Sequence, residues 1–171
     1  MKLGRLIGAS LVACIVAVVA ACGEDKALQP TETNTQASER VEKLIQEAFA
    51  QLPPGSSLKP GIDVKSLPCD DPTDGGPAGR VIVEKRYSIL PPADGAWQAD
   101  QVIPVLAAFW QQQGYKAYSD QRSDKRYPVY SVETPDGYLV TVQGWDREDH
   151  LDYTLGGDSP CIWENGTPDP Q

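Results

Sequence analysis

The spacing of apolar residues predicts two helices. Between residues 38 and 52, apolar side chains recur every three or four positions, which is the pattern of a helix with one buried face. Pro53 ends this helix, because proline cannot continue the hydrogen-bonding ladder. A second helix is predicted from about Asp100 to Gln113, where Gly114 follows. Apolar residues surround the second helix on nearly every side, so we expect it to be the most buried element.

Alternation with a period of two predicts strands in much of the remaining chain. Pro135-Asp136-Gly137 predicts a hairpin turn between two of these strands. Residues 53–79 contain six Pro and five Gly and are predicted to form an extended loop. The predicted strands lie near residues 80–90, 115–122, 127–134, 138–146 and 151–156.

The order of these elements indicates the fold class. A helix, a strand, a second helix and then a run of neighbouring strands is typical of an α+β protein. We expect a two-layer sandwich in which two helices cover one face of a mainly antiparallel sheet of four to five strands. The opposite face should carry alternate residues of the strand at 138–146, namely Leu139, Thr141, Gln143 and Trp145.

This helix-free face is the candidate binding surface. Seven Tyr and four Trp against two Phe suit half-exposed positions, because Tyr and Trp keep a polar group. If Trp145 is exposed beside Leu139, it offers a partner protein or a glycan a surface for stacking. The alternative is that the loop at 53–79 covers Trp145.

The first residues have the pattern of an export signal. Lys2 and Arg5 precede an apolar run that is short for a permanent membrane span and ends Val19-Ala20-Ala21-Cys22. This ending resembles the lipobox of bacterial lipoproteins, in which the cysteine receives diacylglycerol and the chain is cut before it. Residues 1–21 are therefore predicted to be a lipoprotein signal peptide, with Cys22 as the lipidation site. Conventional signal cleavage at the same place is the alternative.

The cysteine count bears on these two alternatives. Removal of the signal takes away Cys14 and leaves Cys22, Cys69 and Cys161, an odd number for an exported chain. Lipidation of Cys22 removes the odd thiol. Cys69 and Cys161 are then predicted to form a structural disulfide, as is common in exported proteins.

Composition divides the rest of the chain. Residues 22–37 are mostly polar and are predicted to be a flexible tether, followed by a single α+β domain at 38–165 and a disordered tail at 166–171. The whole chain has 15 Lys and Arg against 24 Asp and Glu, and loss of Lys2 and Arg5 with the signal leaves 13 against 24, a net charge of −11. This acidity excludes nucleic acid as a partner, because phosphates require clustered cations.

Several short features together resemble the small actinobacterial envelope lipoproteins of the LppA-like kind. The resemblance implies a lipid-anchored α+β domain with one disulfide and no assigned activity, and it offers no catalytic residues to carry over. The features are the lipobox, the early amphipathic helix, Cys69-Asp70 in the loop that follows, Gly114-Tyr115 after the second helix, and Ser159-Pro160-Cys161 near the end.

No catalytic or metal site is predicted. The acidic neighbours of His150, the only histidine, favour a protonated imidazole in a solvated turn rather than a general base. The Ser-x-x-Lys spacing of Ser56 and Lys59 lacks the accompanying Lys-Thr-Gly. Two acidic groups offer oxygens to a cation without the spacing of an EF-hand loop: Asp146, Glu148, Asp149 and Asp152, and Asp70, Asp71 and Asp74. Glu133 and Asp136 remain open as a carboxylate pair for glycoside cleavage.

These features favour a non-enzymatic envelope lipoprotein at the outer face of the cytoplasmic membrane. We expect it to use no cofactor, to attach to the membrane through lipid on Cys22, and to bind an envelope protein or a wall component. The alternative is a small carboxylate-dependent envelope hydrolase that acts on cell-wall glycan.

Overall fold

The structure is a computed structural model that describes residues 29–69, 79–93, 99–148 and 150–168. The predicted signal peptide, Cys22 and the acidic group at residues 70–74 lie outside the described residues. In chain order the elements are α1 (Asn34–Phe49), β1 (Ser57–Pro68), β2 (Arg80–Leu90), the 3-10 helix η2 (Ala99–Gln101), α2 (Val102–Gln112), β3 (Lys116–Asp120), β4 (Val129–Glu133), β5 (Leu139–Asp146), β6 (Leu151–Asp158) and β7 (Ile162–Trp163).

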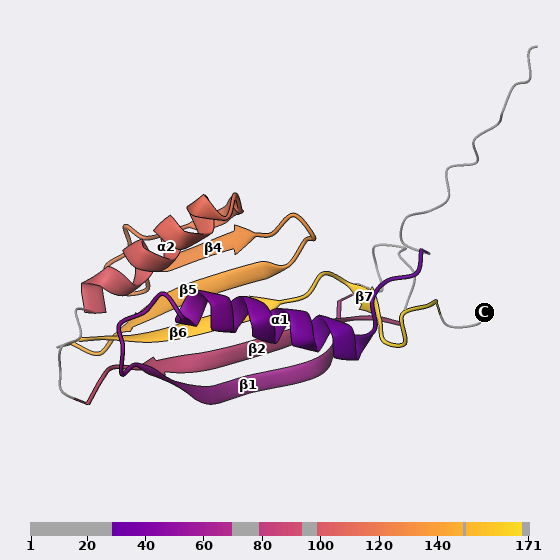
Figure 1. Ribbon diagram of the computed structural model, residues 1–171, viewed down its shortest axis with the longest axis horizontal. Helices are drawn as coiled ribbons and strands as arrows, with labels where there is room; N and C mark the ends of the chain where they lie inside the picture. The colour runs from indigo at the N-terminus through magenta and orange to yellow at the C-terminus, as the bar shows by residue number, and fades with distance from the viewer. Residues whose placement is uncertain (1–28, 70–78, 94–98, 149, 169–171) are drawn as a thin grey trace, which may run out of the picture.

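The strands form one antiparallel sheet with both helices on the same face (Figure 1), which confirms the predicted α+β class. The strand order is β1-β2-β6-β5-β4-β3, and β7 pairs with the beginning of β2. The described part of the sheet has two strands more than the predicted upper limit of five. The additional strands are β1 and β7.

β1 occupies a segment that the sequence predicts as a loop. Its twelve residues run antiparallel to β2, from Ser57 opposite Leu90 to Pro68 opposite Val81. β1 lies at the edge of the sheet, where proline is tolerated because only one side of the strand is paired. The register shifts after Pro60 and after Val64, as at β-bulges. The Pro and Gly residues therefore make an irregular edge strand rather than a loop.

α1 begins four residues before the position that the apolar pattern predicts. Thr33 caps it: Gln36 N donates to Thr33 Oγ1 at 3.3 Å, and Thr33 N donates to Gln36 Oε1 at 2.9 Å. This capping box pairs two backbone N–H groups that a helix end otherwise leaves without partners. The first helical turn thus lies within residues 22–37, the segment interpreted as a tether.

The core lies between the helices and the sheet. α1 packs over β2 and β6, and α2 packs over β4 and β5. A Cβ added to Gly157 of β6 would lie 3.2 Å from Val41 Cγ1, so a glycine at this position lets α1 approach closely. On α2, the Trp110 ring stacks on Tyr130 at 6.1 Å. α2 is not buried on every side, because Pro104 is exposed on its outer surface.

The predicted disulfide between Cys69 and Cys161 is present, with the Cα atoms 6.0 Å apart. Close to it in the fold, the two ends of the described chain meet beside β7 (Figure 1). Thr31 N donates to Gly166 O at 2.9 Å, and Trp163 N donates to Thr31 Oγ1 at 2.8 Å. We call this end of the sheet the disulfide end. None of the described helices is long and apolar enough to cross a membrane.

Candidate functional site

Leu139, Thr141, Gln143 and Trp145 lie on the helix-free face of the sheet, as predicted from their alternation. These four residues are half-buried. They alternate with Val140 and Val142, which belong to the core, and with Gly144, which is buried against Pro128 and Tyr153. Their surroundings differ along the strand. Thr141 pairs with the Ser131 hydroxyl, whereas Trp145 borders a hollow that none of the other three lines.

The middle of the helix-free face carries a network of polar side chains. The hydroxyls of Ser131 and Thr141 lie 2.8 Å apart, and Arg86 Nη2 pairs with Glu84 Oε1 at 2.9 Å. Glu84 lies opposite Asp158 in the register. Burial, and then the charge of Glu84, raise the pKa of the Asp158 carboxyl above its usual value. Two separate pairs, Ser131 with Thr141 and Arg86 with Glu84, therefore use polar groups of this part of the face within the protein, whereas the Asp158 carboxylate is disfavoured there.

Trp145 borders a hollow of about 230 Å³ at the end of the sheet away from the disulfide. We call it the Trp145 hollow. Lys59 of β1, Ser88 of β2 and Thr154 of β6 line it together with Arg147. The Trp145 ring meets Tyr127 edge to face with 5.6 Å between ring centroids, and Tyr127 is 43% exposed. An aromatic wall with hydroxyl, amine and guanidinium groups around it is suited to binding polar, ring-shaped molecules.

Two of the acidic side chains beside the hollow already have partners within the protein. Asp152 accepts a hydrogen bond from Arg147 Nε at 2.8 Å and lies 3.3 Å from His150 Nε2. Asp146 accepts from the backbone N–H of Glu148 at 2.8 Å. Asp149 lies outside the described residues. Within the described ranges, no three His, Cys, Asp or Glu side chains are grouped as metal ligands would be.

The other sequence candidates for chemistry do not converge. Ser56 Oγ donates to Pro53 O at 2.7 Å. Asp136 pairs with Arg40 of α1 at 2.9 Å, whereas Glu133 lies opposite Leu139 on β5. Within the described residues, no hydrogen bond joins Ser56 to Lys59 or Glu133 to Asp136.

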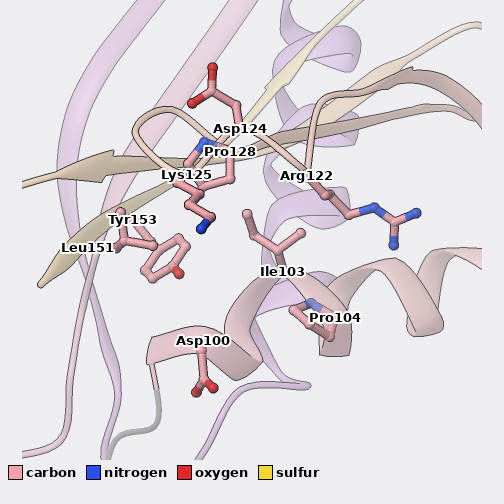
Figure 2. A pocket seen from close by; sticks show the side chains of 9 residues that line it. All are labelled: Asp100, Ile103, Pro104, Arg122, Asp124, Lys125, Pro128, Leu151 and Tyr153. Atoms are coloured by element: carbon pink, nitrogen blue, oxygen red, sulfur yellow. The ribbon is translucent and has the colours of Figure 1, made fainter.

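A second cavity lies at the same end of the sheet but on the helix side, and sequence reasoning missed it (Figure 2). We call it the end cavity. Its volume is about 310 Å³, and its walls come from the start of α2, the loop between β3 and β4, and the start of β6. The sequence feature that could have indicated this cavity is the excess of apolar residues around α2. Two of these residues, Ile103 and Pro104, form one wall of it.

The two cavities are suited to binding, since each combines apolar surface with a few polar groups. The Trp145 hollow presents an aromatic ring to one side of the sheet, and the end cavity opens beside the first turn of α2. Comparison of this chain with known protein families, with curated proteins and with solved structures finds no match.

Proposed function

We propose that this protein is a lipid-anchored envelope lipoprotein whose domain binds a partner or a wall component without catalysing a reaction. The observation that carries the proposal is the disulfide between Cys69 and Cys161. A structural disulfide suits an exported protein, since cytosolic thiols are kept reduced. The pairing leaves Cys22 as the odd cysteine of the predicted mature chain, in the position that a lipobox gives to the lipidated residue.

A lipid on Cys22 would orient the domain on the membrane, because the N-terminal segment joins the domain at one end. Trp163 Nε1 donates to Gln29 O at 3.2 Å, so the N-terminal segment enters the domain at the disulfide end. Residues 23–28 separate Cys22 from Gln29, and a fully extended chain of this length spans about 25 Å at most. A lipid on Cys22 therefore keeps the disulfide end close to the membrane.

The Trp145 hollow then faces away from the membrane. Along β2, the partner of β7 is Arg80, whereas the lining of the hollow begins at Ser88. Eight residues of strand correspond to about 26 Å. An anchored domain of this kind presents Trp145 and Tyr127 outward, where a sugar ring of the wall or an aromatic-binding partner can reach them.

The lipid anchor is tested by labelling with an alkyne fatty acid in a bacterial host that matures lipoproteins. We expect the wild-type protein to take up the label and Cys22→Ser to remain as an unlabelled precursor. The matched control is Cys14→Ser, which should be labelled and cut like the wild type. A soluble, unlabelled mature form of the wild-type protein would contradict the proposal.

Binding by the hollow is tested by co-sedimentation of the purified protein with insoluble cell wall. Loss of an aromatic stacking surface is expected to weaken binding about two- to tenfold in Trp145→Ala, since such contacts contribute about 0.5–1.5 kcal/mol. The control is Tyr118→Ala on the edge strand β3, where the ring is 66% exposed and lines neither cavity. Equal sedimentation of Trp145→Ala and the wild-type protein would remove the hollow as the site.

A further inference from the structure

We propose that the end cavity is a second binding site, for a small molecule with an apolar body and a single carboxylate. The body would lie between Ile103 of α2 and Tyr153 of β6, and the carboxylate would pair with Lys125. This site does not depend on the lipid anchor. Tyr153 lines both the end cavity and the Trp145 hollow, but the Trp145 ring lies on the opposite face of the sheet.

The apolar walls come from elements that the core already holds rigid. Ile103 and Tyr153 are 5% and 4% exposed, and both belong to the main core cluster. Pro104, which the core does not cover, closes another side. A volume of about 310 Å³ is at the lower end of the range for ligand pockets, and it suits a molecule with one ring rather than a peptide.

Lys125 is the cation that remains available in this cavity. Arg122 also lines it, but its guanidinium pairs with Asp120 and lies 4.5 Å from the Tyr130 ring. Lys125 forms no hydrogen bond or ion pair in the described part of the chain. Figure 2 shows its ammonium group pointing into the space between Tyr153 and Ile103. A carboxylate placed there would gain a charge-assisted hydrogen bond.

The acidic residues of the cavity restrict the ligand to one negative charge. Asp124 accepts hydrogen bonds from the backbone N–H groups of Arg126 and Tyr127 at 2.8 and 3.0 Å, and in Figure 2 its carboxylate points away from the cavity. Asp100 lies on the side of the cavity opposite Lys125 (Figure 2). A second anionic group near Asp100 would be repelled, whereas a neutral or donating group would not.

Tyr153 supplies a second polar contact. Burial, and to a smaller extent the charge of Asp100, raise the pKa of its phenol. The hydroxyl therefore stays protonated at neutral pH and is able to donate a hydrogen bond to a ligand oxygen. Lys125 supplies the charge that selects a carboxylate, and Tyr153 supplies a separate hydrogen-bond donor in the same cavity.

The test measures binding of 4-(trifluoromethyl)benzoate to the purified full chain by fluorine NMR. The neutral isostere 4-(trifluoromethyl)benzamide is measured in the same way. We expect saturable binding of the benzoate, at least fivefold weaker binding of the benzamide, and weaker benzoate binding at high salt. Benzamide binding as tight as benzoate binding, or no saturation up to about 10 mM, would overturn the proposal.

Two variants assign the site. Lys125→Met is expected to weaken benzoate binding about tenfold and to abolish the preference over benzamide. Lys65→Met removes another exposed lysine, on β1 and outside the end cavity, and should leave both affinities within twofold. Tyr153→Phe keeps the ring and should weaken benzoate binding while the preference for the charged ligand persists. Unchanged binding and preference in Lys125→Met would refute the assignment to this cavity.

Discussion

Removal of the disulfide is expected to destabilise the domain by about 4 kcal/mol. Cys69 and Cys161 close a ring across 92 positions, and the loop-entropy description gives about 4.6 kcal/mol at 25 °C for a ring of this size. The neighbouring contacts do not require the link: Ser159 Oγ accepts from Val83 N at 2.9 Å, and Ser159 N donates to Val83 O at 2.9 Å. Replacing both cysteines with serine should therefore act mainly by freeing the unfolded chain.

The assay compares urea unfolding of the double variant and its parent by tryptophan fluorescence, with Cys14→Ser and Cys22→Ser in both so that no other thiol takes part. A thermal melt of the same two proteins is the second measurement: for a domain of this size each kcal/mol corresponds to about 3 °C, so we expect the Tm to fall by about 12 °C. With reductant, the parent should have the same free energy of unfolding as the double variant. The free energy of unfolding of the double variant should not change with reductant. A loss below about 1 kcal/mol with an unchanged urea m-value would refute the entropic account.

Three further predictions concern single side chains. The raised pKa of Asp158 means that its ionised form costs stability in the folded state, so Asp158→Asn should raise the Tm at pH 7. A pH series should show this gain in Tm disappear as the pH falls below the usual Asp pKa near 3.8, where the carboxyl is protonated in both the folded and the unfolded state. Gly157→Ala should lower the free energy of unfolding, measured in urea, by about 1–3 kcal/mol, because the added methyl group would press on Val41. The double variant with Val41→Ala should lose less than the sum of the two single losses, and strict additivity would contradict the close contact. Thr33→Ala should cost about 1 kcal/mol in the same assay, whereas Thr33→Ser should cost little, because serine also caps a helix.

The fold class was predictable because local patterns agreed with it. The buried face of α1 and the alternation along β5 each follow from one stretch of sequence. β1 was not predictable in the same way, since Pro60 and Pro68 are signals for a loop and only the pairing with β2 makes the segment a strand. The beginning of α1 was missed because its signal is the polar pair Thr33 and Gln36, and periodicity considers only apolar residues.

The candidate sites depend on contacts between distant segments. Alternation correctly placed Trp145 on the helix-free face, but the hollow beside it needs Lys59 and Arg147, which only the sheet register brings together. The end cavity unites Ile103 with Lys125 and Tyr153, and no local pattern relates these residues. Long-range pairing of this kind does not follow from a single sequence, even where every strand is predicted.

The meeting of the two chain ends also determines how the protein bears mechanical load. A pull applied through residue 29 first reaches hydrogen bonds to the C-terminal segment, including Asn34 N to Glu164 O at 3.0 Å and Thr31 N to Gly166 O at 2.9 Å. That segment is covalently joined to the end of β1 through Cys161 and Cys69. If the chain is anchored as proposed, a pull must break these hydrogen bonds to the disulfide-linked segment before it acts on α1 alone.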